Sequence, residues 1–470
     1  MKNRINAPVP FAHACASIVV VCVLLLSPRG GVGQVESFGN NASDSYYGNS
    51  KVDSPRVTID RPKPIYMLHE RDPRIHGLKP FQSLVDAAEA GSTLRPPPGV
   101  YAGPVDVNKA LTIEGGGAVT IDAGDKGTVM VLNASDSVVR GLRLTGSGAS
   151  HDTDDSCLDV RGNRNVIEDL TADNCLFGID LKQSSNSVVR NNRIRSKPLD
   201  LGMRGDGLRL WYSHDNLIEA NEVIDSRDMV AWYSHRNTFR GNIGQRSRYS
   251  IHFMFGDDNI VENNHFKDNA VGVYFMYTRG GAARGNLISH STGATGMGIG
   301  FKQASNTMIE DNEIIYCAVG IGSDLSPFEP DSTIELTGNR FAYNGIAILF
   351  NSERGGNNLR NNVFEGNLTD VSYGGRSEDP DKNFWEGNYW DTYQGFDANG
   401  DGIGDTPHES YAWADQIWME FPMASFFRAS PVLELLNFLE RLAPFSWPEL
   451  ILRDEKPRFT KPRREKEPAP

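Results

Sequence analysis

The sequence has few cysteines, a deficit of basic residues and a single long apolar run, and each shortage excludes a class of protein. Five cysteines in 470 residues are too few for a disulfide-rich secreted scaffold. The 47 lysines and arginines are outnumbered by 60 aspartates and glutamates, which gives a net charge of −13. Such an acidic chain is a poor nucleic-acid binder and attracts cations. Its 39% apolar content is nevertheless enough for one long domain with tails.

The apolar run covers residues 15–26 and follows Lys2 and Arg4. It is too short to cross a bilayer comfortably. We therefore predict a signal peptide over residues 1–33 and export of the chain to the periplasm, with an uncleaved anchor as the alternative. Cleavage would remove three basic residues and no acidic ones, which takes the net charge from −13 to −16.

Three cysteines remain beyond the signal peptide: Cys157, Cys175 and Cys317. They are odd in number and lie on different repeats, so they predict buried thiols and no disulfide framework.

Residues 206–312 repeat themselves with a period near 22, as short alternating strands separated by Asn and Gly turns. One such repeat cannot bury its own apolar face, so the repeats must stack. We predict an all-β fold, a right-handed parallel β-helix over residues 79–395. A leucine-rich repeat is the alternative, but the anchor columns hold Val, Ile, Phe and Tyr. Stacked asparagines that adopt the left-handed region are expected at the turns: Asn221, Asn242, Asn264, Asn286, Asn312, Asn339, Asn362 and Asn388.

The flanking segments have different compositions. Residues 34–78 are expected to be flexible, and residues 81–90 have helical spacing that suits an N-terminal capping helix. Insertions near residues 151–155 and 196–204 should bulge from one side of the solenoid. The C-terminal part divides into an Asp/Gly-rich loop (396–410), a helical docking segment (411–453) and a disordered tail (454–470). Trp385, Tyr389 and Trp390 are expected to plug the last coil.

The Asp/Gly-rich loop matches the first half of a calcium-binding loop. Its oxygen ligands are Asp397, Asn399, Asp401 and Asp405, with Gly402 at the turn. His408 stands where a bidentate acid is usual, so calcium and a plain turn both remain open.

The docking segment carries leucines at helical spacing. This apolar stripe would pack on the solenoid, or would bind a partner protein or a membrane surface. Its residues are Leu433, Leu436, Leu439 and Leu442.

Strand alternation sorts the repeats into faces. Columns such as Leu210, Ala231, Phe253 and Phe275 must point inward. Two neighbouring columns then point outward: Arg209, Val230, His252 and Tyr274, and beside them Trp211, Trp232, Met254 and Met276.

Exposed Trp and Met in adjoining columns require an explanation. A partner or the tail covering Trp211 and Trp232 is one. The other is a metal, because thioethers with an imidazole suit Cu(I). This gives His252, Met254 and Met276 as copper ligands, with Met203 and Met297 as further candidates. Since these side chains point outward, we predict that replacing them changes stability by no more than about 0.5 kcal/mol.

A polysaccharide lyase or epimerase on a β-helix is the competing function. Its candidate acids all lie at turns, and no column of paired acids is expected on the outward face. They are Asp206, Asp228, Asp257 and Asp258.

Several longer motifs resemble the NosD family of nitrous oxide reductase maturation proteins. They are 210–213 (LWYS), 227–234 (RDMVAWYS), 251–254 (IHFM), 272–277 (GVYFMY), 295–301 (TGMGIGF), 388–391 (NYWD), 395–405 (GFDANGDGIGD) and 430–446 (SPVLELLNFLERLAPFS). The resemblance extends from about residue 81 to residue 452.

This resemblance implies a periplasmic β-helix that helps to assemble the copper centres of nitrous oxide reductase. It also implies partners: an ABC transporter with its ATPase and membrane permease, a copper chaperone lipoprotein, and the apo form of nitrous oxide reductase. We expect a protein that holds or passes copper without turnover chemistry. A scaffold for the reductase that binds no metal is a further alternative.

Overall fold

The computed structural model describes residues 75–351, 355–374, 382–412, 430, 431, 435, 438, 439 and 449–462. The predicted signal peptide and nearly all of the predicted flexible segment lie outside them. The chain divides into two units, residues 1–69 with 438–447 and residues 70–437 with 448–470. The first unit contributes two described residues, Phe438 and Leu439, which are helical. Within the described part of the chain, no helix is long and apolar enough to cross a membrane.

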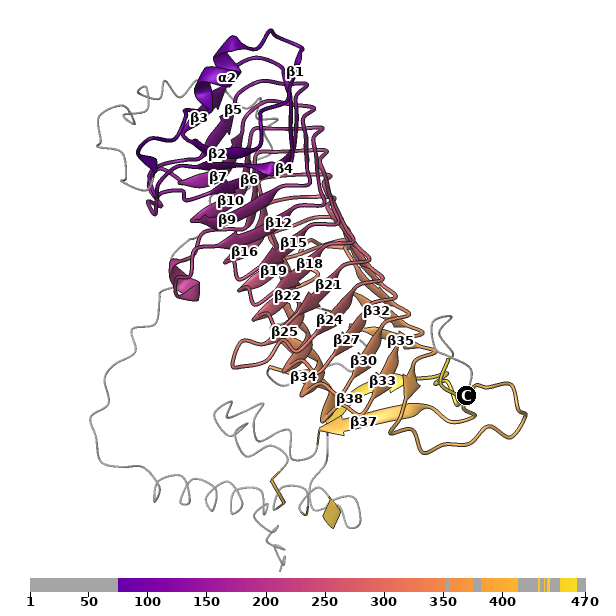
Figure 1. Cartoon of the computed structure of the whole chain (residues 1–470). Coiled ribbons are helices and arrows are strands. Elements are labelled where there is room, and N and C mark those ends of the chain that lie inside the picture. The colour runs from indigo at the N-terminus through magenta and orange to yellow at the C-terminus, as the bar shows by residue number, and fades with distance from the viewer. Residues whose placement is uncertain are drawn as a thin grey trace, which may run out of the picture. The chain divides into compact units, whose positions relative to one another are not determined.

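The second unit is a parallel β-helix, as predicted (Figure 1). In the repeating part, each coil contributes one strand to a 12-stranded sheet and two strands to a 24-stranded sheet, and the strands of successive coils pair in parallel. The 12-stranded sheet consists of β3 (Val105–Val107), β5 (Met130–Leu132), β7 (Ser156–Val160), β10 (Phe177–Lys182), β13 (Leu208–Trp211), β16 (Asp228–Trp232), β19 (Tyr249–Met254), β22 (Val271–Met276), β25 (Met297–Lys302), β28 (Val319–Asp324), β31 (Ile346–Asn351) and β34 (Thr369–Tyr373).

The 24-stranded sheet begins with four strands of unequal length and continues as two rows, one for each of the remaining strands of a coil. The first four are β1 (Thr93–Leu94), β2 (Gly99–Ala102), β4 (Thr112–Asp122) and β6 (Val138–Thr145). One row is β8 (Val166–Glu168), β11 (Val188–Arg190), β14 (Leu217–Glu219), β17 (Thr238–Arg240), β20 (Ile260–Glu262), β23 (Ala282–Arg284), β26 (Thr307–Glu310), β29 (Ile334–Thr337), β32 (Asn357–Arg360) and β35 (Phe384–Glu386). The other is β9 (Thr171–Cys175), β12 (Arg193–Ser196), β15 (Glu222–Ile224), β18 (Ile243–Gln245), β21 (His265–Lys267), β24 (Leu287–Ser289), β27 (Glu313–Ile315), β30 (Arg340–Ala342), β33 (Val363–Glu365) and β36 (Tyr389–Trp390).

The core is a continuous stack of apolar side chains inside the coils. The predicted inward column is confirmed, since Ala231, Phe253 and Phe275 pair in register and are almost fully buried. The rings of Phe253 and Phe275 lie 5.2 Å apart, and the stack continues into Phe301. Burying such columns, at about 25 cal/mol per Å² of apolar surface, is what drives the coils to stack.

The stacked asparagines form a ladder along one corner of the coils. Nδ2 of Asn264 donates to Oδ1 of Asn286 at 2.9 Å, and Asn286 donates to Asn312 at 2.8 Å. The expectation that these asparagines adopt the left-handed region is wrong. The residue before each of them does, for example Asn263 and Gly285. The ladder asparagines instead satisfy backbone groups that the turns leave unpaired.

Both ends of the solenoid are covered. The predicted N-terminal helix is present as the shorter α2 (Gln82–Ala87), and Figure 1 shows it at the first coil. At the other end, Trp385 and Trp390 are buried as predicted, and the Trp390 ring stacks on Phe364 at 4.1 Å.

The C-terminal boundaries need correction. The segment predicted as helical over 411–453 begins and ends in an antiparallel hairpin, β37 (His408–Ala412) and β38 (Glu449–Asp454). Residues 454–462 of the predicted disordered tail are ordered, because buried Asp454 accepts hydrogen bonds from Asn388 and Trp390. Pro431, Leu435, Phe438 and Leu439 are helical. Three leucines of the predicted stripe lie outside the described residues: Leu433, Leu436 and Leu442.

The prediction of three free thiols is wrong for two of them. Cys157 in β7 and Cys175 in β9 form a disulfide, and only Cys317 is a free, buried thiol among the described cysteines. The prediction failed because an odd number of cysteines still allows one disulfide. In addition, the coil places β7 and β9 close together inside the core, and this proximity is not evident from the spacing of the two cysteines in the sequence.

Candidate functional site

The outward face of the 12-stranded sheet carries the predicted metal ligands. Strand register pairs Trp232 with Met254 and Met254 with Met276, while His252 pairs with Tyr274 in the adjacent column. Successive strands lie about 4.8 Å apart. The structure therefore brings the three ligands predicted from the sequence onto one face. Because their neighbours Ile251 and Phe253 are fully buried, the assignment of inner and outer faces is confirmed.

His252 is oriented by an acidic residue. Its Nδ1 lies 3.9 Å from Oδ2 of Asp228, and Asp228 is held by Arg248, whose Nε donates to it at 3.1 Å. Burial would raise the pKa of Asp228, but the hydrogen bonds of His252 and Arg248 and the charge of Arg248 keep that pKa below its ordinary value. A carboxylate at Nδ1 favours the tautomer whose Nε2 carries the lone pair.

That Nε2 atom is unusual. It is buried and has no hydrogen-bond partner among the described residues, although buried polar atoms are normally paired. Only 8% of His252 is exposed, because the rings of Tyr249 and Tyr274 lie 4.8 and 6.0 Å from its own. Burial raises the pKa of Tyr274 to about 12, so its phenol stays neutral. A soft cation would supply the partner that Nε2 lacks.

The two further methionine candidates are positioned differently. Met297 lies flat on the outward face, since a Cβ added at Gly300 or Gly322 would come within 2.8 or 2.9 Å of its Sδ. Tyr274 also contacts the Gly300 position, so it stands between Met297 and His252. Met203 is in the short 3₁₀ helix η2 (Leu201–Met203), is 60% exposed, and precedes β13, two strands before His252. Met297 joins the face, whereas Met203 does not.

His214 and His235 stack at 5.2 Å in the turn after the strand. Nδ1 of His214 accepts the backbone N–H of His235, and Nδ1 of His235 accepts that of Asp257. In the neutral ring the proton is then on Nε2, so neither nitrogen offers a free lone pair. These histidines therefore satisfy backbone donors at the turn.

An aromatic ladder lies beside the metal candidates. The rings of Trp211 and Trp232 meet edge to face at 5.0 Å, and Nε1 of Trp232 is buried without a hydrogen-bond partner among the described residues. A second stack at the next turn was missed from the sequence, and its rings lie 4.9 to 5.1 Å apart. It consists of Tyr212, Tyr233, Phe255 and Tyr277. Its signal in the sequence is an aromatic residue three positions before each turn Asp, Arg or Gly.

Acids do pair on the outward face, contrary to the prediction. Asp159 lies opposite Asp180 in register, and both are buried. Lys182 Nζ lies 3.2 Å from Asp159 and 3.1 Å from Asp180, and Arg209 donates to Asp180 at 3.0 Å. Asp159 and Asp180 lie about one repeat length apart, but the prediction aligned the repeats only from residue 206 onward. The 29 residues between Asp180 and Arg209 interrupt that alignment.

Insertions cover this network, as predicted from one side of the solenoid. Asp154, in the first insertion, lies 2.8 Å from Arg209 and 3.3 Å from Lys182. The second insertion meets the first where His151 Nε2 lies 3.2 Å from the Met203 carbonyl oxygen.

Two of the acids predicted for an enzyme, Asp206 and Asp228, lie near each other, but each is neutralised by its own arginine. Asp206 is bound by Arg227 and Asp228 by Arg248, each from the following coil. Burial and the nearby Asp228 raise the pKa of Asp206. Asp257 accepts the backbone N–H of Arg279. With Asp258 at a left-handed turn position, these acids act as partners between coils.

The carboxylates of the Asp/Gly-rich loop bind backbone N–H groups. Asp397 accepts from Gly400 and Gly402, and Asp405 accepts from Ala398. Across the described residues, no three His, Cys, Asp or Glu side chains gather as a metal site. Calcium at Asp397, Asn399, Asp401 and Asp405 stays a prediction.

The chain is similar in sequence to proteins of one known family. The model of a family described as "Periplasmic copper-binding protein (NosD)" matches residues 194–395, which include all of β13 to β36. A Pseudomonas aeruginosa protein named a probable ABC transporter binding protein NosD is 26% identical over 74% of this chain and 83% of its own length. These matches support membership of the NosD family. A Stutzerimonas stutzeri NosD of the same name is 27% identical over 39% of each chain.

Solved structures with a similar chain path are β-helix proteins of low identity. The A-module of the Azotobacter vinelandii mannuronan C-5 epimerase AlgE6 is 16% identical over 62% of this chain and 90% of that one, with a TM-score of 0.49. The Streptococcus pneumoniae surface adhesin PfbA is 12% identical over 63% of this chain and 87% of that one, with a TM-score of 0.43.

Proposed function

We propose that this NosD-family protein is a periplasmic maturation factor for the copper centres of nitrous oxide reductase, and that it holds Cu(I) as cargo at His252, Met254 and Met276. The observation that carries the proposal is the buried, unpartnered Nε2 of His252 beside two thioethers in register. Soft thioethers and a neutral imidazole select Cu(I) over Zn(II) and Ca(II).

The ligands and their neighbours would also allow the Cu(I) ion to be released to a partner. Thioethers bind Cu(I) weakly one at a time, so a three-ligand site holds the ion without trapping it. Met297 would receive the ion beyond Tyr274 on the same face. The acidic chain, with a net charge of −13, attracts cations from a distance.

X-ray absorption of the Cu(I)-loaded protein tests this ligand set. We expect two sulfur scatterers and one imidazole nitrogen, and loss of the imidazole signal in His252→Ala. A shell of nitrogen and oxygen only would contradict the proposal.

Asp228 should act as a positioning residue for His252. Asp228→Asn removes the charge that favours the Nε2 lone pair, and such partners of a ligating histidine typically contribute tenfold to a hundredfold in metal affinity. We expect about tenfold weaker Cu(I) binding, with the imidazole still detected in the absorption spectrum. Asp215→Asn, which alters a similar Asp–Arg pair between Asp215 and Arg236 outside the site, serves as the control. Equal Cu(I) affinities of the two variants would show that Asp228 does not position His252.

The proposed partners are an ABC transporter permease and ATPase, a copper chaperone lipoprotein and the apo-reductase. Trp211 and Trp232 offer a contact surface beside the copper ligands.

The leucine stripe predicted from the sequence at residues 433–442 is the proposed contact with the permease. Leu436→Asp with Leu439→Asp should give a folded protein that no longer co-purifies with the transporter. Undiminished co-purification would remove the stripe from the interface.

An enzyme acting on uronate polymers is the second candidate. It is favoured by one observation, the buried Asp159–Asp180–Lys182–Arg209 network on the outward face. We expect no unsaturated products and no epimerised residues from alginate or polygalacturonate with the wild-type protein. An activity that Asp180→Asn abolishes would establish the enzyme instead.

A further inference from the structure

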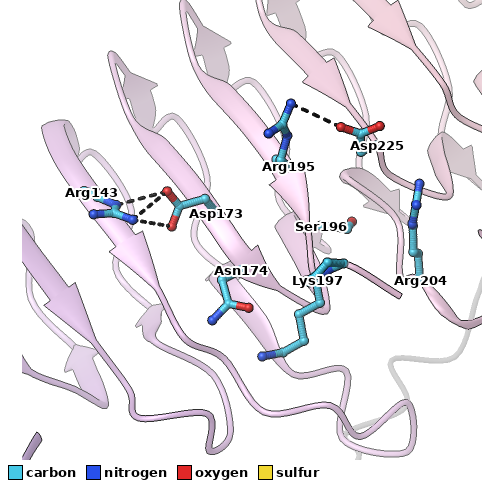
Figure 2. A pocket seen from close by; sticks show the side chains of 9 residues that line it. Arg143, Asp173, Asn174, Arg195, Ser196, Lys197, Arg204 and Asp225 are labelled. Atoms are coloured by element: carbon cyan, nitrogen blue, oxygen red, sulfur yellow. Dashed lines mark hydrogen bonds and ion pairs between the residues drawn. The ribbon is translucent and has the colours of Figure 1, made fainter. Parts of the chain in front are cut away.

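A pocket of about 510 Å³ opens where the second row of the 24-stranded sheet turns toward the 12-stranded sheet. Its lining comes from β6, β9, β12, the insertion after β12 and the turn after β15 (Figure 2). The lining residues are Arg143, Asp173, Asn174, Arg195, Ser196, Lys197, Pro198, Arg204 and Asp225. None of them belongs to the proposed copper site.

The pocket is basic although the chain is acidic. Four basic side chains line it against two acidic ones. Two charged groups outside the lining bind to it: Arg246 binds Asp225, and Asp125 binds Lys197 at 2.8 Å. Their opposite charges cancel, so the excess of positive charge remains. Lys197 is only 8% exposed, so its charge is held at the pocket in a partly desolvated setting where charges act more strongly.

Arg204 has N–H donors that are not engaged by another described residue, whereas the donors of Arg143 and Arg195 face carboxylates. Arg143 binds Asp173 through two nitrogens, and Arg195 lies 3.2 Å from Asp225. Arg204 donates only its Nε, to the carbonyl oxygen of Leu199 at 2.7 Å. Its terminal nitrogens have no ion-pair partner among the described residues, and Figure 2 shows no bond between this side chain and Arg195 or Asp225.

We infer that this pocket binds an oxyanion, held by the terminal nitrogens of Arg204 with Arg195 nearby, while Lys197, whose amine points away from Arg204, adds positive charge at the other end of the pocket (Figure 2). A guanidinium recognises carboxylate and sulfate-like groups through parallel N–H donors. The anion would come either from a small inorganic species or from an acidic side chain of a partner protein. Because no step involves copper, the inference stands apart from the proposed function.

Isothermal titration of the metal-free full chain tests the pocket with two probes, sodium sulfate and an acetylated tetraglutamate peptide, against chloride at matched ionic strength. We expect saturable binding of at least one probe and about tenfold weaker binding by Arg204→Gln, which removes the charge and the fork. Sulfate binding alone identifies a small oxyanion, and tighter peptide binding identifies an acidic partner segment.

Arg193→Gln is the matched control. Arg193 lies in β12, as Arg195 does, but it pairs with Glu222 and is outside the pocket lining, so this variant should bind like the wild type. Arg195→Gln, at a side chain that is 59% exposed, replaces Arg204→Gln if that variant fails to fold. Absence of binding by the wild type, or wild-type affinity in a folded pocket variant, overturns the inference.

Discussion

Replacing the three proposed copper ligands together, as His252→Ala, Met254→Leu and Met276→Leu, should weaken Cu(I) binding by at least about 100-fold, which corresponds to about 2.7 kcal/mol. The reason is that, among the described strands, the column of Met254 and Met276 continues into Trp232 and Lys302 and holds no other thioether, and Tyr274 separates Met297 from His252. Cells carrying the triple variant should produce a nitrous oxide reductase that lacks copper. Competition with a Cu(I) chelator measures the affinity.

Met308→Leu is the control, because Met308 is 38% exposed on β26, outside the 12-stranded sheet. It should leave affinity unchanged. Stability must be measured alongside, because the expected change within about 0.5 kcal/mol applies to exposed positions and the His252 side chain is only 10% exposed. For this burial we expect His252→Ala to destabilise the protein by about 1–2 kcal/mol. Unchanged Cu(I) affinity in a folded triple variant would make these residues a partner contact.

Breaking the asparagine ladder should have the largest effect on stability. Asn286 is 1% exposed and takes part in four hydrogen bonds besides its own backbone pairing. Its Oδ1 accepts from the backbone and side-chain nitrogens of Asn264, and its Nδ2 donates to Val261 and Asn312. Asn286→Leu leaves Asn264 donors buried without an acceptor. We expect a loss of about 4 kcal/mol.

Because each coil contacts mainly its neighbours, the loss should be local. Hydrogen exchange followed by mass spectrometry should show faster exchange in the coils of Asn264 and Asn312 and little change near the ends. Asn108→Leu, at an exposed asparagine that bonds to Asn133, should be close to neutral. Uniform exchange along the solenoid would contradict the ladder's role.

The repeat near residue 206 was enough to predict the fold and the direction of the side chains from Ile251 to Met254 on β19. Alternation along one strand separates Ile251 and Phe253 from His252 and Met254, and a period near 22 aligns Met254 with Met276. Both follow from strand geometry alone. Alternation could not predict that His252 is buried. The burial arises because the rings of Tyr249, on the same strand, and Tyr274, on the next coil, pack against the imidazole.

Features that depend on irregular coils escaped prediction. Cys157 bonds with Cys175 within one coil, and Arg209 meets Asp180 across an insertion that lengthens the repeat. The path of Met297 depends on two glycines, Gly300 and Gly322, that leave room on the sheet. The pocket around Arg204 combines five segments of the chain. None of these arises from a local pattern.

The most direct measurement is the copper content of the wild-type protein, purified under reducing conditions from cells grown with copper. The His252, Met254 and Met276 cluster predicts about one Cu(I) per chain, lost on dialysis against a strong Cu(I) chelator and absent from the triple variant. Wild-type protein that neither carries copper nor takes up Cu(I) added in solution would contradict the claim that this face holds the metal.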